Sequence, residues 1–432
     1  MLKRIVIGAA SLGIACLLVF LALAWRTAIA PIDLPEKTSF PADLIAKGEV
    51  LAGAGHCALC HTNRGGPALA GGLGVPTPFG TIYSTNITPE PETGIGRWSL
   101  EAFTRAMHEG VSRDGSHLFP AFPYNHFTKI SDDDVKALYA YVMTRPPVKS
   151  VAPANTIPFP LNIRLLQEGW KILFFRNARY QADAARSAEW NRGAYLAEGL
   201  ADCGGCHTPR NSLGAEKTAD AYAGATIDNW IAPALTDANP SPVPWTKDEL
   251  FSYLRNGVAP LHGVTAGPMS PVIHAGLSAV PDSDVQAIAE YFADLNHATS
   301  RTGAVDATVK EALARSSLGS TREYDPDARL YAGACLGCHY NAGPTPLAVR
   351  PELALNSALN LPEPTNFIRV VLNGIGISEG GPGLVMPSYA AALSDADIAR
   401  LAAYLRRTRT NKRPWTDIEK KIAAARAQGT SN

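Results

Sequence analysis

The chain has 432 residues with 39 basic and 39 acidic side chains, so its formal net charge is zero. A nucleic-acid-binding protein normally carries a clear basic excess, and we therefore exclude that class. Hydrophobic residues make up 46% of the chain, which is enough for buried cores and excludes wholesale disorder. The length predicts roughly two to four domains.

The N-terminal segment from Ile5 to Trp25 carries no charge and follows two basic residues. A membrane-spanning helix needs about 20 apolar residues, whereas the apolar part of a secretory signal has about 7–15. We therefore expect a signal-anchor or transmembrane helix within residues 1–30, with the rest of the chain exported. Residues 28–30, Ala-Ile-Ala, resemble a signal cleavage site, so a cleaved signal is the alternative. Cys16 is interpreted as a small apolar residue of this helix.

Six of the seven cysteines form three copies of the pattern Cys-x-x-Cys-His, the signature of c-type haem attachment. Two thiols one helical turn apart can bond to the two haem vinyl groups, and the adjacent histidine can bind the iron. Zinc would require the pairs to combine into four-ligand sites, although they lie far apart in sequence. Disulfides would not explain a histidine after every second cysteine. We expect three covalent haem c groups, attached at Cys57, Cys60, Cys203, Cys206, Cys335 and Cys338, with proximal ligands His61, His207 and His339.

Each pattern belongs to a longer repeat that is predicted to be helical. One helix in each copy ends in glycine before a loop, and these segments are 98–110, 245–257 and 362–374. A closing amphipathic helix follows over 131–142, 281–292 and 394–405, and begins with Ser or Pro and acidic residues. The first helices carry Gly48, Gly193 and Gly333, and the closing helices carry Tyr141, Tyr291 and Tyr404. A glycine–aromatic crossing between these helices is a reasonable expectation.

The copies differ at the expected sixth iron ligand, which in electron carriers is usually Met. Counting twelve residues from the helix-ending glycine reaches Met269 in the second copy and Met386 in the third. The shared offset favours these two thioethers as ligands, although a core role is the alternative.

The same count reaches Phe122 in the first copy. His126 on the same loop is our candidate ligand for the first iron, because a neutral imidazole can bind it. His117 and an open or otherwise ligated iron are the alternatives. Met107 aligns with core positions of the other copies, and His108 lies at a helix end.

We predict an all-α fold with three tandem class I cytochrome c domains after the N-terminal membrane helix. The domains are 40–145, 189–296 and 324–408, joined by an inter-domain segment 146–188 and a linker 297–323. The apolar parts of 146–188 predict packing across the first two domains, with a partner or membrane surface as the alternative. The basic tail 409–432 and the arginines just before it are expected to form a solvated face, or else to dock on lipid or a partner.

With these landmarks in place, the chain resembles the membrane-bound three-haem cytochrome c subunits of periplasmic dehydrogenases acting on alcohols, gluconate, sorbitol, fructose and aldehydes. The resemblance covers roughly residues 40–410 and includes the segments Ser84–Pro89, Gly94–Trp98, Trp190–Leu196 and Cys203–Asn211. It implies that electrons arrive from a catalytic subunit and leave to ubiquinone at the periplasmic face of a bacterial inner membrane. Phe122 departs from the alcohol dehydrogenase branch and looks like subunits paired with molybdenum hydroxylases and their iron–sulfur subunit. A quinoprotein or flavoprotein partner therefore stays open.

The sequence thus predicts an electron-transfer subunit without a substrate pocket of its own. Two alternatives follow from the missing methionine and the haem count. One is a multihaem peroxidase-like enzyme with an open first haem, and the other is an electron-entry module of a terminal oxidase. Carbon monoxide binding to the reduced first haem would distinguish the peroxidase, and co-purification would distinguish the oxidase.

Overall fold

The protein is seen in a computed structural model that describes residues 1–318, 325–341, 346, 351–376, 379 and 385–429. It is mostly helical and divides into two compact units. The first unit is Met1–Ala182 with Glu198–Asp202, and the second is Asp183–Ala197 with Cys203–Asn432. The end of the predicted linker and the predicted start of the third domain, residues 319–324, lie outside the described residues.

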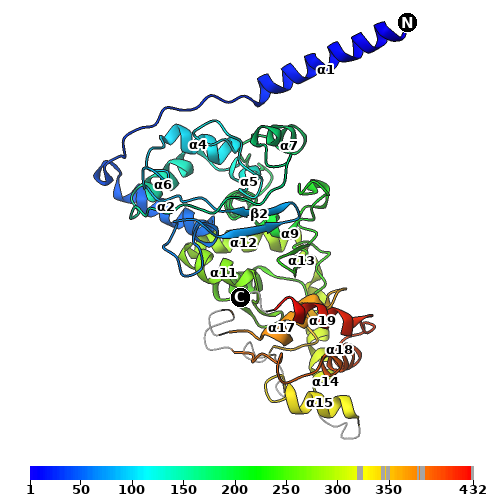
Figure 1. Cartoon of the computed structure of the whole chain (residues 1–432). Helices are drawn as coiled ribbons and strands as arrows, with labels where there is room; N and C mark the ends of the chain where they lie inside the picture. The colour runs from blue at the N-terminus through cyan, green and yellow to red at the C-terminus, as the bar shows by residue number, and fades with distance from the viewer. Residues whose placement is uncertain (319–324, 342–345, 347–350, 377–378, 380–384, 430–432) are drawn as a thin grey trace. The chain divides into compact units, whose positions relative to one another are not determined.

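The first unit contains the N-terminal apolar helix and the first Cys-x-x-Cys-His pattern (Figure 1). Its elements are α1 (Leu2–Ala24), α2 (Ala42–Ala54), α3 (Cys57–His61), β1 (Gly74–Thr77), β2 (Gly80–Tyr83), α4 (Leu100–Glu109), α5 (Tyr124–Phe127), α6 (Asp132–Met143) and α7 (Gln167–Phe174). Among the described residues, α1 alone is long and apolar enough to cross a membrane, with a mean hydropathy of 2.7. A core cluster of Ile95, Tyr139, Val142 and Met143 packs α6 against the loop before α4.

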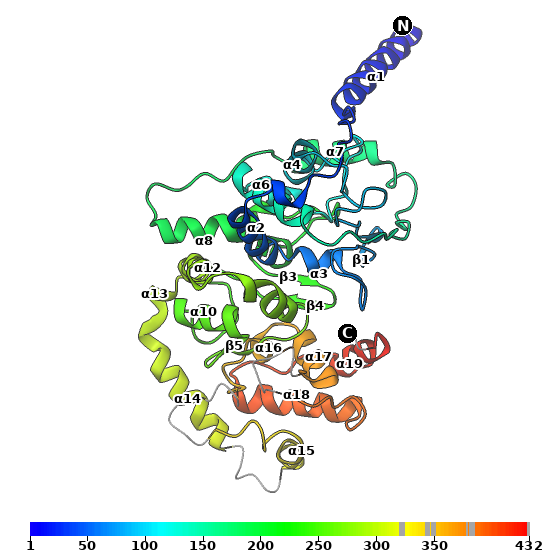
Figure 2. The same cartoon turned by 90° about the vertical axis from the view of Figure 1, so that its left-hand side faces the viewer.

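The second unit contains the other two patterns (Figure 2). Its helices are α8 (Ala188–Glu198, whose last residue groups with the first unit), α9 (Cys203–His207), α10 (Lys247–Asn256), α11 (Met269–Pro271), α12 (Asp282–Leu295), α13 (Ala298–Arg301), α14 (Val305–Leu318), α15 (Pro326–Ala334), α16 (Ser357–Asn360), α17 (Thr365–Asn373), α18 (Asp395–Arg409) and α19 (Ile418–Ala427). Its strands are β3 (Ala225–Ile227), β4 (Trp230–Ala232), β5 (Val258–Ala259) and β6 (Gly263–Val264).

The strands form three antiparallel two-stranded hairpins, β1–β2, β3–β4 and β5–β6. The prediction of an all-α fold therefore holds for the helical cores, and the small hairpins are an addition to it. Most of the predicted second domain and the described part of the predicted third domain belong to the second unit, whereas Glu198–Asp202 of the second domain group with the first unit.

The predicted repeat helices are confirmed, and side-chain caps explain where several begin. The Ser99 hydroxyl accepts a hydrogen bond from the Ala102 amide at the start of α4, and Thr246 caps α10 through the Glu249 amide. Ser394 and Asp397 form a reciprocal capping box at the start of α18. At their C-terminal ends α4 and α10 stop at Gly110 and Gly257, which adopt left-handed φ values of 59° and 75°.

The glycine–aromatic crossing is confirmed in two copies, and Gly333 of the third copy makes no such contact among the described residues. A Cβ on Gly48 would overlap the Ala137 carbonyl and come 2.7 Å from the Tyr141 Cβ. A Cβ on Gly193 would likewise overlap the Ala287 carbonyl and lie 3.0 Å from the Tyr291 Cβ. A Cβ on Gly333 would meet no described heavy atom within 4 Å. The first two copies therefore bring their first and last helices together at a glycine.

Part of the segment 146–188 packs on the hairpin β1–β2 of the first unit. The Thr81 amide donates to the Thr156 hydroxyl at 2.8 Å, and the Tyr83 amide donates to the Asn155 side-chain oxygen at 2.7 Å. This stretch therefore packs within the first unit, and the prediction that segment 146–188 packs across the first two domains stays a prediction.

The solvated basic face predicted around the start of the tail is wrong for two residues. Arg406 and Arg409 are buried, because each guanidinium donates to backbone carbonyls, Arg406 to Leu359 at 2.8 Å and Arg409 to Arg315. The long side chains also contribute their planar groups to packing, since Arg406 lies 4.3 Å from the Trp415 ring centroid.

Candidate haem sites

The first Cys-x-x-Cys-His pattern forms the short helix α3, which places His61 at its C-terminal end. The His61 Nδ1 lies 2.7 Å from the Thr85 carbonyl oxygen. A carbonyl can only accept, so Nδ1 carries the proton and Nε2 keeps the lone pair that an iron would need. Burial lowers the pKa of His61, which also favours the neutral ring.

The second pattern repeats this geometry in α9. The His207 Nδ1 lies 2.7 Å from the Pro233 carbonyl oxygen, and burial lowers the pKa of this histidine too. The loops after the two patterns also match, because the Gly71 amide donates to the His61 carbonyl and the Gly224 amide to the His207 carbonyl, both at 2.7 Å. Both glycines have positive φ values, of 72° and 89°.

The threonine that follows each of these histidines makes a matching bond. The Thr62 hydroxyl accepts from the Leu69 amide and the Thr208 hydroxyl accepts from the Tyr222 amide, each at 3.1 Å. Sequence reasoning missed these loop residues and the Thr85 and Pro233 carbonyls. The shared Thr after His, and the Ala-Gly that closes each loop, were the signals available for finding them.

The third pattern begins where α15 ends, with Cys335 as the C-terminal cap. The His339 Nδ1 lies 3.4 Å from the Pro351 carbonyl, a longer contact than in the other copies. Tyr340 occupies the position of the threonine. The His339 ring therefore also turns its Nδ1 toward a backbone carbonyl, but fewer hydrogen bonds among the described residues support the loop around it.

The cysteine chemistry fits haem better than zinc or disulfides. The structure describes all seven cysteines, and none is in a disulfide. Burial raises the pKa of Cys57 to about 12 and that of Cys335 to about 11, so both side chains are protonated thiols when no group is bound to them. Among the described residues, no cysteine joins a cluster of three groups with metal-ligand spacing. The residues present therefore fit covalent haem.

The loops that should carry the sixth ligand are built alike in the first two copies. The Leu118 amide donates to the Gly110 carbonyl and the Thr265 amide to the Gly257 carbonyl, both at 2.8 Å and both eight residues after the glycine. This match supports the count that pairs Phe122 with Met269. In the third copy, Met386 exchanges two backbone hydrogen bonds with Ile375, at 2.9 and 3.0 Å. Phe122, Met269 and Met386 are all half-buried.

His126 has oxygen partners at both ring nitrogens. Its Nδ1 lies 2.9 Å from the Glu198 carbonyl oxygen, and its Nε2 lies 3.0 Å from the Asp202 carboxylate. Residues 198–202 belong to the first unit together with His126. Both ring nitrogens thus lie within hydrogen-bond distance of an oxygen, and iron binding through Nε2 would require the Asp202 contact to break. The ligand role of His126 stays a prediction.

The alternatives near the first copy also have other surroundings. His117 is buried between the Ala24 carbonyl, 2.8 Å from Nε2, and the Lys171 ammonium, 3.0 Å from Nδ1. His108 is buried, and its Nδ1 accepts from Arg179. Met107 is buried on α4, which agrees with its interpretation as a core residue.

Comparison with known proteins decides the family. A family model for cytochrome c matches residues 45–146, and one described as cytochrome c oxidase, cbb3-type, subunit III matches residues 323–405. The chain is 36% identical over 394 residues to the fructose dehydrogenase cytochrome subunit of Gluconobacter japonicus, covering 86% of this chain and 80% of that protein. The chain belongs to the cytochrome c electron-transfer subunits of membrane-bound dehydrogenases.

Two further relatives agree with this family. The chain is 36% identical over 406 residues to the gluconate 2-dehydrogenase cytochrome c subunit of Pantoea cypripedii, covering 90% of each. It is 48% identical over 414 residues to a nicotinate dehydrogenase subunit of Pseudomonas putida, covering 95% of this chain. Those residues are 34% of that protein, so the chain spans about a third of its length.

Proposed function

We propose that the chain carries three covalent haem c groups and passes electrons, one at a time, from a catalytic dehydrogenase subunit to ubiquinone. The observation that carries this proposal is the repeated orientation of the histidine after each Cys-x-x-Cys pair. Each ring has its Nδ1 turned toward a backbone carbonyl, so that Nε2 is the nitrogen left for the iron. The three domains of this proposal are 40–145, 189–296 and 324–408.

The haem, when bound, supplies a one-electron iron couple whose potential depends on its axial ligands. The chain's own residues hold it and orient the ligand: six thiols attach it, and the proximal imidazoles are His61, His207 and His339. Met269 and Met386 are the proposed sixth ligands of the second and third sites, and His126 is that of the first.

The catalytic partner is proposed from the relatives. One relative is named as a nicotinate dehydrogenase subunit, and the first copy has Phe122 where the alcohol dehydrogenase branch has Met, so a molybdenum hydroxylase with an iron–sulfur subunit is our first choice. A quinoprotein or flavoprotein is the other choice, since fructose and gluconate dehydrogenase subunits are also relatives. Because α1 is uncharged from Ile5 to Ala24, we place the chain at the periplasmic face of a bacterial inner membrane, held by this helix.

The test is the haem count of the purified protein and of three variants. Expression with a periplasmic haem-attachment system should give three haems per chain, measured as the pyridine haemochrome against protein mass. Replacing both cysteines of one pattern by Ser should remove one haem from that count in each case. A parent count of two, or a double variant that loses none, would show that the affected pattern does not attach haem.

A second candidate function follows from the contacts of His126. If the Asp202 contact persists in the haem-loaded protein, the first iron lacks this ligand and a peroxidase-like reaction becomes available to it. Carbon monoxide added to the reduced parent separates the two cases. No binding supports a six-coordinate first haem, and His126→Ala should then open it. Full binding at one haem in three would favour the peroxidase-like function.

A further inference from the structure

Helix α7 buries its charged side chains and exposes apolar ones, which is the reverse of what is usual for a helix on a surface that faces water. Its two charged residues, Glu168 and Lys171, are buried, whereas Ile172 and Leu173 are 57% and 67% exposed. A surface helix in water normally buries its apolar stripe and exposes its charges. The outer face of α7 is therefore suited to an apolar environment.

The chain just before α7 continues this exposed apolar surface. We call the apolar strip the set of exposed large hydrophobic residues in this part of the first unit, Phe159, Leu161, Ile163, Leu166, Ile172 and Leu173. Between residues 157 and 176 the only carboxylate is the buried Glu168, whereas Arg176 is exposed. The strip therefore presents no negative charge of its own.

Buried polar contacts fix the orientation of α7. The Lys171 ammonium donates to the Glu109 carbonyl at 2.6 Å and to the Gly110 carbonyl at 2.8 Å. It also lies 3.0 Å from the His117 Nδ1. Rolling the helix to hide Ile172 would remove three contacts from a buried charge, so the exposed apolar face is held in place.

The C-terminal end of α1 is attached to the same structure. The His117 Nε2 donates to the Ala24 carbonyl, the last residue of α1, at 2.8 Å. Arg26 pairs with Glu168 of α7 at 3.4 Å. Gly169 of α7 faces Phe20 of α1, at 3.8 Å from where a Cβ would lie. Figure 1 and Figure 2 both show α7 beside this end of α1.

The depth of this contact follows from helix geometry. The 23 residues of α1 span about 35 Å, which is slightly longer than the ~30 Å hydrocarbon core of a bilayer. Phe20 lies four residues before the end of α1, or about 6 Å along its axis. Helix α7 therefore meets α1 at the level where lipid headgroups and acyl chains adjoin.

We propose that the apolar strip inserts into the outer leaflet of the membrane that α1 crosses, so that the first unit lies on the bilayer. The proposal rests on α1 being the retained anchor of the proposed function. Lipid is the occupant because α7 contacts, at interfacial depth, a helix that is apolar enough to cross a membrane, and because the strip lacks exposed carboxylates. Tyr124, two residues after Phe122, packs edge-on against Trp170 and Phe175, so the loop of the first haem site lies behind this surface.

The experiment measures the depth of a spin label in the full-length holoprotein in nanodiscs of phosphatidylethanolamine and phosphatidylglycerol. Cys16→Ser removes the one cysteine outside the haem patterns, and Leu173→Cys then supplies a labelling site. The label should collide with oxygen more often, and with a water-soluble nickel complex severalfold less often, than a label at Val151→Cys. Val151 is a matched control, because it is apolar, exposed and in the same unit.

The outcomes separate this proposal from the others. The Cys16→Ser parent should take up no label, because its other cysteines are bonded to haem. Labelling of this parent would contradict complete haem attachment, which belongs to the proposed function and not to the membrane contact of the strip. Equal nickel accessibility at 173 and 151 in nanodiscs would overturn the membrane contact. Protection of 173 only in the complex with the catalytic subunit would also overturn it, because the strip would then be a subunit interface. Ile172→Cys provides a second site on the same face.

Discussion

The second and third repeats lie in the same unit but hold their first and last helices together in different ways. In the second repeat, Gly193 lets α8 approach the backbone of α12 directly, and Arg192 makes a two-pronged ion pair with Asp284 at 2.8 and 2.7 Å. In the third repeat, a Cβ on Gly333 would meet no atom of the residues that the structure describes within 4 Å.

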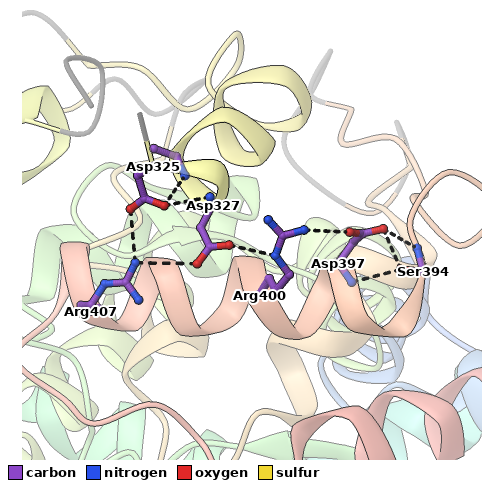
Figure 3. Close-up of polar contacts among 7 residues, drawn as sticks. Asp325, Asp327, Ser394, Asp397, Arg400 and Arg407 are labelled. Atoms are coloured by element: carbon purple, nitrogen blue, oxygen red, sulfur yellow. Dashed lines mark hydrogen bonds and ion pairs between the residues drawn. The ribbon is translucent and has the colours of Figure 1, made fainter. Parts of the chain in front are cut away.

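Charged pairs join α15 to α18 in the third repeat (Figure 3), beside a buried apolar cluster that includes Ala328, Tyr331 and Tyr404. Arg400 lies 2.9 Å from Asp327, and Arg407 lies 3.5 Å from Asp325 and 3.8 Å from Asp327. A backbone crossing depends on the absence of one Cβ atom, whereas exposed ion pairs contribute little each and weaken with salt. The second repeat therefore has a crossing that tolerates no added Cβ, whereas the third joins its two helices through the buried contact of Tyr331 with Tyr404 and through exposed ion pairs.

The largest expected effect is that of Gly193→Ala. The new Cβ would overlap the Ala287 carbonyl, so the helices must separate along their whole contact. We expect a loss of about 3 kcal/mol or more in the free energy of unfolding, the upper end for an overpacked core, measured by urea unfolding of the holoprotein. Gly333→Ala is the matched control, and we expect it to be neutral or to gain up to about 1 kcal/mol from helix propensity. Equal losses for the two variants would contradict the difference between the repeats.

The next effect concerns the sixth ligands of the two repeats. Met269→Ala and Met386→Ala should each lower one haem potential, on the order of 0.1 V or more within the ~0.8 V range set by axial ligands. The potential falls because the thioether favours ferrous iron. Each variant should also lose the Met–iron charge-transfer absorption of its own haem, because the sulfur–iron bond is gone. Redox titration followed by optical spectroscopy measures both. Unchanged spectra and potentials in both variants would mean that neither Met is a ligand.

The sequence predicted much of this comparison, because the repeat helices follow from apolar periodicity and caps such as Ser394. It also predicted the crossing at Gly193, but the same reasoning was wrong at Gly333. Gly333 lies two residues before Cys335, whereas Gly48 and Gly193 lie nine and ten residues before Cys57 and Cys203, so Gly333 does not occupy the crossing position. The sequence patterns also could not predict the partners of His126, because residues 126 and 202 come together only in the tertiary structure.

A smaller effect is expected on the pH dependence of the free energy of unfolding, and its source is His262 in the second repeat. His262 is buried, stacks on Trp245 with ring centroids 3.7 Å apart, and has its pKa lowered by burial to about 3. The folded form resists protonation below the ordinary pKa of 6.5, which the unfolded chain retains. The contribution of His262 to the free energy of unfolding is therefore fully present above pH 6.5. It is lost as the pH falls from 6.5 toward 3, and the loss is about 2 kcal/mol at pH 5.

The measurement is urea unfolding at pH 7 and pH 5 for the parent and for His262→Asn. Asn can retain the contact that the ring Nδ1 makes with the Ser241 hydroxyl at 2.9 Å, but it does not titrate. The variant should lose less stability than the parent between these two pH values. An identical pH dependence in both proteins would show that His262 is not the source of the acid sensitivity.

The smallest effect is expected at the charged pairs of the third repeat. Arg400 bridges Asp327 of α15 and Asp397 of α18, and its side chain is partly exposed. Arg400→Gln should therefore cost no more than about 1 kcal/mol in unfolding free energy at low ionic strength, and the difference from the parent should shrink in ~1 M salt. Arg400→Lys retains the charge and should recover part of the loss. A cost that is as large in high salt as in low salt would mean that Arg400 acts through packing, and the third repeat would then resemble the second.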